Sequence, residues 1–167
     1  MADEKETKYE VRSLKSGELD DAALQRCADI LKAGGAVEPV SVAQLRRATK
    51  LVLATKGVEI VGVGTIKGIR KNYTARVAGP KKSGFAFPAE TPELGYIAVD
   101  PAHRQKGLSH GLLDALLKDQ EAALFATTYD PRMKKTLSAA GFTEKGKEWK
   151  GREQMLSLWL RDQPLKR

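Results

Sequence analysis

One short segment constrains the fold more than any other. The run from Glu93 to Val99 (Glu-Leu-Gly-Tyr-Ile-Ala-Val) is apolar on both faces after its first residue. Alternate residues of a strand point to opposite faces of its sheet, so this strand must be covered on two sides. Asp100-Pro101 ends the run, and apolar residues at i, i+4, i+7 and i+8 then predict an amphipathic helix from Gly107 to about Lys118. The pattern predicts a central strand in a sheet with helices on both faces.

The rest of the chain divides into further short elements. Strands are expected near 8–14, 50–55, 58–69, 122–127, 142–149 and 153–160, and helices from Asp20-Asp21 to Gly34-Gly35, near 41–49 with Ser41 as N-cap, and from Pro131 to Gly141. Turn pairs at Gly79-Pro80 and Ser83-Gly84 predict that 70–92 is an extended strand end leading into a long loop. We therefore expect an α/β (α+β) fold, with a mixed, mostly antiparallel central sheet flanked by helices. One domain is expected to span residues 1–167, with polar N- and C-terminal tails.

Charge and hydropathy narrow the classes of partner. The formal net charge of +8 describes a protein that attracts anions, whether a phosphorylated ligand, nucleic acid or an acidic protein surface. Nucleic acid is not favoured, because aromatic residues are few and the basic residues are scattered. No apolar run approaches the ~20 residues needed to span a bilayer, and the polar N-terminus lacks the apolar stretch of a signal peptide. We expect a cytoplasmic protein with no membrane partner.

Three other features do not indicate a site. Gly62-Val63-Gly64 lies inside the predicted strand 58–69 and opens no helix, so it is not a nucleotide-binding fingerprint. His103 and His110 lack the clustered ligands of a metal site, and no metal is expected. Cys27 lies on the apolar face of the first predicted helix, which favours a buried structural thiol over a nucleophile.

The segment between the apolar strand and its helix, from Val99 to Ser109, has the chemistry of an anion site. A helix start leaves backbone N–H groups unpaired and carries partial positive charge, so it stabilises a phosphate. Gly107 lets the backbone approach a ligand closely, while Arg104 and Lys106 add full charges. The order Lys106-Gly107 excludes a Walker loop. On this segment alone, an ordinary loop with solvated basic residues remains the alternative.

This segment resembles the pyrophosphate motif of the GNAT superfamily of acyl-CoA-dependent N-acetyltransferases, V-x-P-x-x-R/Q-x-x-G-x-G/A. Val99, Pro101, Arg104 and Gly107 match in register, and Ser109 stands where the family has Gly or Ala. A second block, Asp130 to Phe142, is similar to the family's helix that ends in Gly-Phe. The order of elements also agrees along nearly the whole chain. The resemblance implies a GNAT-like fold and acetyl-CoA as the acyl-donor substrate.

The resemblance also implies roles for particular residues. The implied cofactor-binding residues are Ile97, Ala98, Val99, Arg104, Gln105, Lys106, Gly107, Leu108, Ser109 and Asp130. The Val99 N–H is the expected donor to the developing oxyanion. Glu93 stands near the place where several family members carry a general base that acts through water, and its alternative is a solvated residue at a strand end.

The chain differs from many family members at the residue that protonates the leaving thiolate of CoA. Many members place a tyrosine four residues before the Gly of the Gly-Phe pair, whereas this chain has Leu137. Tyr129, Ser138 or water would then protonate the thiolate; Tyr129 is alternatively a packed residue at a strand end.

The implied reaction is direct attack by a deprotonated primary amine on the thioester in a ternary complex. An acyltransferase acting on nucleic acid or aminoacyl-tRNA and a non-catalytic acyl-CoA-binding module are the alternatives. Neither the identity of the acceptor nor the oligomeric state follows from the sequence.

Overall fold

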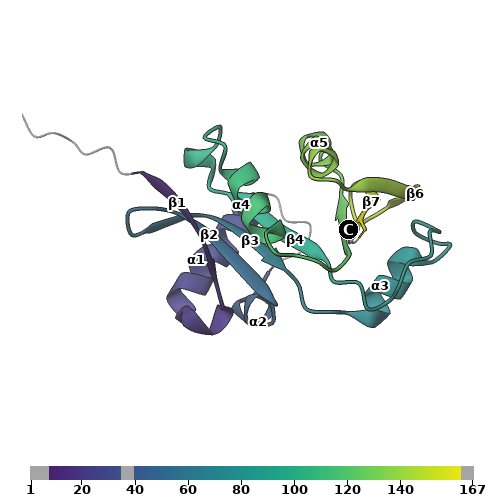
Figure 1. Cartoon of the computed structure of the whole chain (residues 1–167), viewed down its shortest axis with the longest axis horizontal. Coiled ribbons are helices and arrows are strands. Elements are labelled where there is room, and N and C mark those ends of the chain that lie inside the picture. Colours follow the sequence, from purple (N-terminus) through teal and green to yellow (C-terminus); the bar gives the residue numbers. More distant parts are fainter. Residues whose placement is uncertain (1–7, 35–39, 163–167) are drawn as a thin grey trace, which may run out of the picture. The chain divides into compact units, whose positions relative to one another are not determined.

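The computed structural model describes residues 8–34 and 40–162. The elements in chain order are β1 (Tyr9–Leu14), η1 (Ser16–Glu18), α1 (Asp21–Ala33), α2 (Val42–Arg46), β2 (Lys50–Lys56), β3 (Glu59–Ile66), α3 (Lys71–Ala78), β4 (Leu94–Val99), η2 (Pro101–His103), α4 (Leu108–Leu117), β5 (Leu124–Thr128), α5 (Pro131–Ala139), β6 (Thr143–Lys150) and β7 (Met155–Arg161). The strands form a four-stranded sheet in the order β1-β2-β3-β4 and a three-stranded sheet in the order β5-β7-β6. With helices flanking antiparallel strands (Figure 1), the predicted α/β (α+β) class is confirmed.

The chain divides into two compact units. The first takes the chain up to Thr65 together with Tyr96–Lys118, and the second takes Ile66–Gly95 together with the chain from Asp119 onward. The four-stranded sheet therefore belongs to the first unit, apart from the last residue of β3 and the start of β4. A single domain over residues 1–167 stays a prediction.

In the first unit, one face of the sheet is covered by α1. β1 pairs with β2 in antiparallel register, with Tyr9 opposite Lys56. The buried residues of α1 pack with those of α2, β2 and β3 in one core, which comprises Leu24, Cys27, Ala28, Ile30, Leu31, Leu45, Leu51, Leu53 and Val63. Burial raises the pKa of the Cys27 thiol to about 11. Cys27 is thus a buried thiol, as predicted.

The predicted N-caps of the first two helices are confirmed. The Ala23 N–H donates to the Asp20 carboxylate at 2.8 Å, which satisfies one of the unpaired donors at the start of α1. Ser41 and Gln44 form a reciprocal capping box at the start of α2. Gly34 ends α1 and Gly35 lies outside the described residues.

The opposite face of the same sheet is covered by α4, as Figure 1 shows. Gly62 and Gly64 of β3 make this packing close. A Cβ on Gly64 would lie 2.8 Å from Leu116 Cδ1, and one on Gly62 would lie 3.3 Å from Leu112 Cδ1. The Gly-Val-Gly sequence therefore accommodates a helix, in agreement with the prediction that it is not a nucleotide fingerprint.

β4 is only partly covered, because its four middle residues are half-buried, and it is the end strand and not the predicted central strand of its sheet. On one face, a Cβ on Gly34 of α1 would lie 2.8 Å from the Ala98 Cβ. On the other, Ile97 Cγ1 lies 3.7 Å from the Cβ position of Gly64, beneath α4. Tyr96 has φ +52°, a left-handed conformation that is uncommon for a residue with a side chain and interrupts the regular strand.

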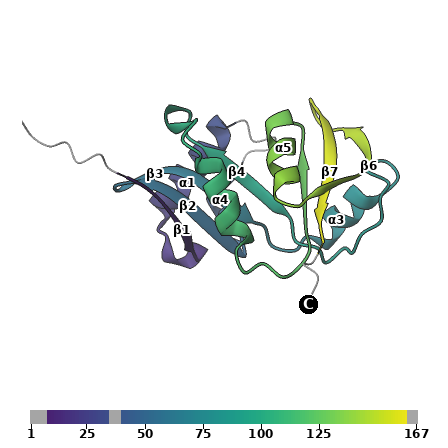
Figure 2. The ribbon, with the colours of Figure 1, turned by 45° about the horizontal axis from the view of Figure 1, so that its top comes forward.

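In the second unit, β7 pairs with β5 and β6 in antiparallel register, and the pairing with β6 shifts between Lys145 and Trp149. Figure 2 shows α5 and α3 on either side of β6 and β7. The core of this unit comprises Val77, Phe125, Trp149, Leu158 and Leu160. The predicted helix from Pro131 ends at Ala139, and Gly141 just beyond it has φ +94°.

The prediction that 70–92 is an extended strand end and a loop was wrong, because residues 71–78 form the helix α3. Thr74 and Val77 are buried one turn apart, and Val77 reaches the core of the second unit. Gly79-Pro80 marks the end of this helix and not a turn within a loop. β3 accordingly ends at Ile66, earlier than the expected residue 69.

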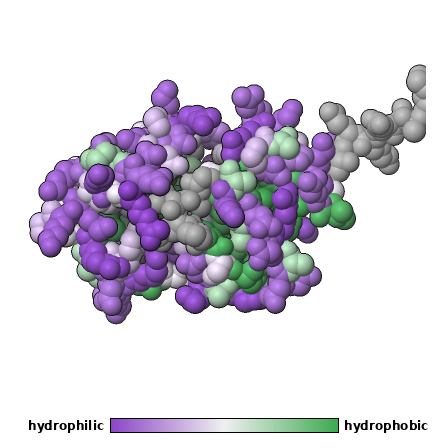
Figure 3. Space-filling model, turned by 180° about the vertical axis from the view of Figure 1, so that it is seen from behind, coloured by the Kyte–Doolittle hydropathy of each residue, from purple (hydrophilic) through white to green (hydrophobic). Residues whose placement is uncertain are grey.

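The surface of the described residues is largely polar. The face in Figure 3 is mostly hydrophilic, and the large apolar side chains that are exposed are Val58, Ile69 and Met155. No helix within residues 8–34 and 40–162 is long and apolar enough to cross a membrane.

Candidate active site

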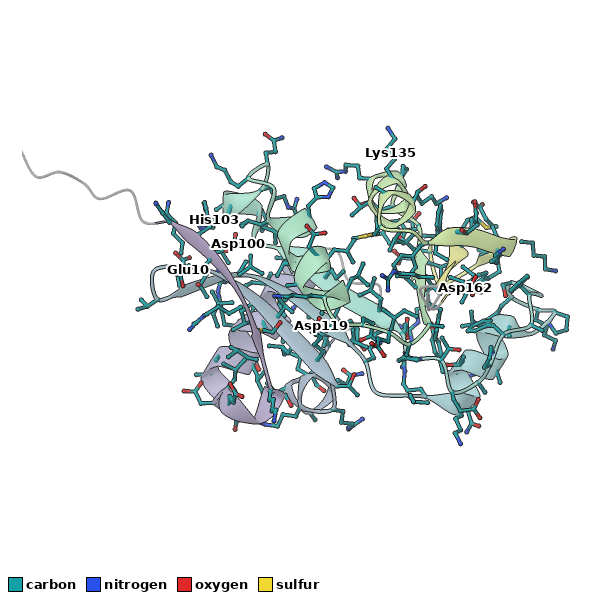
Figure 4. All side chains as sticks on the ribbon, viewed as in Figure 1. Glu10, Asp100, His103, Asp119, Lys135 and Asp162 are labelled. Carbon is teal, nitrogen blue, oxygen red and sulfur yellow. The ribbon has the colours of Figure 1, made fainter. Side chains whose placement is uncertain are left out.

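The loop that joins β4 to α4 in the first unit begins with a tight turn. The Ala102 N–H donates to the Asp100 carboxylate at 3.0 Å, which caps η2 with Pro101 at its first turn. The His103 N–H donates to the Asp100 carbonyl at 2.8 Å, and Figure 4 shows the two side chains near each other. These bonds set the direction of the chain as it leaves the sheet.

The second half of the loop turns the backbone toward the start of α4. Gln105 and Gly107 both have left-handed φ values, +64° and +74°. No atom lies within 4 Å of the position that a Gly107 Cβ would occupy. Glycine is therefore favoured here by its φ and by the open approach it leaves to the backbone, and not by packing inside the protein.

The N-terminus of α4 is open. Among the described residues no side chain caps it, and the Gly111 N–H is the first to bond back along the helix, to the Gly107 carbonyl at 3.2 Å. The earlier N–H groups, those of Leu108, Ser109 and His110, are the donors that a helix start leaves without a helical partner. They lie at the positive end of the helix dipole, where an anion is stabilised.

Most predicted cofactor-binding residues of this loop lie at the surface. The exposed ones are Arg104, Gln105, Lys106, Gly107 and Ser109. Leu108 is buried, so it can offer a ligand only its backbone. From Pro101 to Leu113 the sequence contains no acidic residue. The loop thus presents donors and positive charge to an anion with no carboxylate in this stretch to oppose it.

Arg26 of α1 holds the start of the loop. Its guanidinium donates to the Asp100 carboxylate at 2.6 Å and to the Ile60 carbonyl at 3.2 Å. The Asp100 N–H in turn donates to the Val61 carbonyl at 2.8 Å. The Ala102 N–H, followed by Arg26, holds the pKa of the Asp100 carboxyl below its usual range. These contacts join α1, β3 and the loop.

His103 ties the loop to β1. Its Nδ1 lies 2.9 Å from the Tyr9 hydroxyl, and its Nε2 lies 3.9 Å from the Glu59 carboxylate. Tyr9 and Arg26 were not predicted to be parts of this site. Neither is near the loop in the sequence, and no local pattern connects them to it.

The predicted β4 residues differ in exposure. Val99 is buried, while Ile97 and Ala98 are half-buried. The left-handed Tyr96 precedes all three and breaks the extended backbone. Hydrogen bonds from this strand to a thioester, including the predicted oxyanion bond from the Val99 N–H, stay predictions.

Glu93, in the second unit, is buried and ion-paired. It lies directly before β4 and forms an isolated parallel bridge with Phe125. Its carboxylate lies 3.3 Å from Lys67 Nζ and 2.7 Å from Arg70 Nη2, with 6% of the side chain exposed. The alternative of a solvated residue at a strand end is therefore wrong: Glu93 is an internal carboxylate held by two cations.

The end of β5 carries the remaining predicted site residues. Tyr129 is half-buried. Asp130 caps α5, accepting a hydrogen bond from the Arg132 N–H at 2.9 Å, while its own N–H donates to Thr128 Oγ1. Leu137 is 1% exposed, so an apolar side chain fills the position of the family's tyrosine. Catalysis by Tyr129 and cofactor binding by Asp130 stay predictions.

The two histidines of the chain have different surroundings. Within residues 8–34 and 40–162, no group of three His, Cys, Asp or Glu side chains is placed to hold a metal ion. His103 is engaged with Tyr9. His110 is an exposed residue of the first turn of α4.

Comparison with known proteins shows the family and the fold of the chain. The model of the acetyltransferase (GNAT) family matches residues 22–135, which is more than half of the chain and runs from α1 into α5. No curated protein matches the sequence. Solved structures also match, and those described next do so at low sequence identity, so they show a shared fold.

Three of these structures illustrate the likeness. The ribosomal-protein-S18-alanine N-acetyltransferase of Escherichia coli is 15% identical, with 96% of this chain and 97% of that chain covered and a TM-score of 0.67. ElaA of Escherichia coli is 15% identical, with 93% and 100% covered and a TM-score of 0.68. The yncA protein of Salmonella typhimurium, described as an acetyltransferase and solved with its cofactor acetyl-CoA, is 15% identical, with 95% of each chain covered and a TM-score of 0.63. The resemblance drawn from the two sequence blocks is confirmed, and the chain belongs to the GNAT family of acyl-CoA-dependent acetyltransferases.

Proposed function

We propose that the protein is an N-acetyltransferase that transfers an acetyl group from acetyl-CoA to a primary amine. The observation that carries this proposal is the open N-terminus of α4, which begins at the left-handed Gly107 and lacks a side-chain cap among the described residues. A pyrophosphate needs several donors and positive charge at one place. The unpaired N–H groups of the first turn and the exposed Arg104 and Lys106 meet that need.

The residues present fit the donor substrate. Arg104, Gln105, Lys106, Gly107 and Ser109 would bind the pyrophosphate with the Leu108 N–H, while the half-buried Ile97 and Ala98 would line the path of the pantetheine. Asp130 is the further cofactor contact that the family resemblance implies. The anchoring of the loop by Arg26 supports binding, because a loop that is already ordered loses little entropy when a ligand arrives.

The chemistry follows from the two substrates. A primary ammonium with a pKa near ~10 is a poor nucleophile at neutral pH, so a base must remove a proton before the nitrogen attacks the thioester carbonyl. We assign that role to Glu93, acting through water. The Val99 N–H would stabilise the oxyanion, after which the bond to sulfur breaks. Tyr129, Ser138 or water would then give a proton to the thiolate, whose thiol has an ordinary pKa of about 8.5.

Transfer to nucleic acid or aminoacyl-tRNA is the second candidate, and one observation favours it. No acidic residue occurs from Ile60 to Ala89, a stretch that contains six Lys and Arg residues: Lys67, Arg70, Lys71, Arg76, Lys81 and Lys82. Most of these side chains are exposed. Binding to such an acceptor would weaken steeply as salt is added, which distinguishes it from a small neutral amine.

The testing experiment combines binding with turnover. Saturating acetyl-CoA should raise the melting temperature, because a ligand that binds only the folded state stabilises it by mass action. Release of free CoA thiol is then measured with a panel of small amines, peptides and aminoacyl-tRNA. No thermal shift would remove the cofactor assignment. A shift without thiol release from any acceptor would favour a non-catalytic acyl-CoA-binding module.

A further inference from the structure

The second unit contains an ion-pair cluster at the start of β4, in which the buried Glu93 and the half-buried Lys67 meet the exposed Arg70. Each carboxylate oxygen of Glu93 faces a different cation: Oε2 lies 3.3 Å from Lys67 Nζ, and Oε1 lies 2.7 Å from Arg70 Nη2. The Glu93 and Lys67 side chains are 6% and 15% exposed. A carboxylate and an ammonium are rarely placed together so far from water unless each compensates the other.

Burial and pairing act on Glu93 in opposite directions. Removal from water favours a neutral carboxylic acid, whereas a cation within about 4–6 Å favours the carboxylate. A base must be ionised before it can accept a proton. The two cations therefore compensate the charge of a carboxylate that is largely removed from water.

Lys67 is held against Glu93 by the backbone as well as by charge. The Lys67 N–H donates to the Glu93 carbonyl at 2.9 Å. The Lys67 side chain also runs across Gly95, where a Cβ would lie 2.8 Å from Lys67 Cε and 3.2 Å from Nζ. A glycine at position 95 therefore leaves the space through which the ammonium reaches the carboxylate.

Arg70 makes the shorter contact with Glu93, a charge-assisted hydrogen bond at 2.7 Å, but from a more exposed position than Lys67. Its side chain is 42% exposed, so water screens its charge more than it screens that of Lys67. Its guanidinium also lies over the Tyr73 ring, 4.2 Å from the centroid. The bridge partner of Glu93 on β5 is Phe125, which carries no charge. Within the described residues, the charged groups that face Glu93 are thus these two cations, one after β3 and one at the start of α3.

We propose that Lys67 is a positioning residue that keeps the Glu93 carboxylate ionised and oriented for proton transfer. This inference rests on the proposed function, with Glu93 as the base. The substrate ammonium gives one proton through water to the Glu93 carboxylate, which becomes a neutral acid, and the freed nitrogen lone pair attacks the thioester. The Glu93 proton then passes to solvent.

The test follows the ionisation of Glu93 and the activity separately. The carboxyl carbons of the full chain are labelled by ¹³C-glutamate and titrated by NMR, with Glu93→Gln identifying the Glu93 signal. In Lys67→Met, that signal should titrate about one to two pH units higher than in the wild type. The acidic limb of kcat/KM, measured with acetyl-CoA and the amine of highest turnover in the panel, should move upward by the same amount.

Two further variants separate the charge from the fold. Lys67→Arg keeps a cation and should restore both curves toward the wild type. Gly95→Ala keeps the lysine but places a methyl group where its stem lies, so both curves should shift in the direction of Lys67→Met. Because a flexible side chain can move aside, this variant should stay folded.

Either of two results would overturn the inference. An NMR titration curve that is unchanged in Lys67→Met would show that Lys67 does not affect the ionisation of Glu93. A titration that moves while the acidic limb of the activity stays in place would show that Glu93 is not the base. Failure of the proposed function is distinguishable, because the wild type would then release no thiol while the NMR titration still decides the role of Lys67.

Discussion

Two strands of this protein are followed by the same dipeptide, and the chain continues differently after each. Asp100-Pro101 follows β4, and Asp130-Pro131 follows β5 by one residue. In both places the aspartate accepts a hydrogen bond from the N–H two residues later, at 3.0 Å and 2.9 Å. After β5 the helix begins at once. After β4 a single 3₁₀ turn forms, and α4 begins only at Leu108.

The difference decides which helix can bind an anion. At α5 the protein's own carboxylate occupies the N-terminus, so its positive end is already compensated. At α4 the corresponding carboxylate is left behind at η2, and the intervening residues include Arg104, Lys106 and the left-handed Gly107. The same aspartate cap thus closes the N-terminus of α5. Before α4 the aspartate caps η2 instead, several residues earlier, so the N-terminus of α4 stays open.

The largest effect is expected from Gly107→Val. A β-branched side chain resists the left-handed φ of +74° and would stand where the anion must approach. The affinity for CoA, measured by calorimetry, should fall by about 10- to 100-fold, in line with the loss of charge-assisted hydrogen bonds. Gly107→Asn is the matched control, because asparagine tolerates this φ better. Unchanged affinity in a folded Gly107→Val variant would place the phosphate site elsewhere.

A carboxylate at the start of α4 should make it resemble α5. Ser109→Asp puts a negative charge in the exposed first turn, which should stabilise the fold by about 0.3–1 kcal/mol through the helix dipole. The same charge should repel pyrophosphate and weaken CoA binding by roughly tenfold. Thermal unfolding and calorimetry measure the two effects, with Ser109→Asn as the neutral control. A stabilised variant with normal CoA affinity would contradict the assignment of this helix start.

The converse change opens α5. Asp130→Ala removes the cap from the Arg132 N–H and should cost about 1 kcal/mol in the free energy of unfolding, measured with urea. Asp130→Asn retains a capping oxygen and should stay near the wild type in stability. Since Asn keeps the cap, CoA affinity in this variant reports directly on the predicted cofactor contact of Asp130. A stable Asp130→Asn variant with normal CoA affinity would remove that contact from the site.

The smallest effect concerns the other aspartate. The pKa of Asp100 is lowered in the folded protein, by the Ala102 N–H first and by Arg26 next, so its ionisation stabilises the fold. That contribution is present above the unfolded pKa of about 3.9 and is lost as pH falls through the lower folded value. Asp100→Asn should therefore be less stable than the wild type at pH 6, by less than the loss of the α5 cap, and the gap should close in acid. A gap that persists at low pH would mean that charge is not its cause.

Local signals predicted much of the fold and of the anion site. Aspartates and serine before apolar stripes identified the starts of α1 and α2, and the residues from Arg104 to Ser109 identified the candidate phosphate loop. These features depend on neighbours within a few residues, so a single sequence contains them. The comparisons confirmed the family that the two blocks suggested.

What the sequence left out depends on distant contacts. The helix α3 was not predicted because Gly79-Pro80 indicates a turn as readily as a helix end, and the burial of Val77 against Phe125 decides between them. Arg26 gave no signal because it meets Asp100 across 74 positions. The burial of Glu93 between Lys67 and Arg70 likewise depends on where β3 ends and α3 begins.

The buried thiol of α1 has a practical consequence for kinetics. Cys27 is the sole cysteine of the chain, and thiol reagents react with the thiolate, which a pKa of about 11 keeps scarce. Colorimetric detection of released CoA should therefore carry almost no background from the folded enzyme. Conversely, slow alkylation of Cys27, followed by mass spectrometry, should report how often the region around α1 opens to solvent. Cys27 should thus add almost no signal to the thiol assay during turnover, while its slow alkylation over longer times should measure the rate of local unfolding.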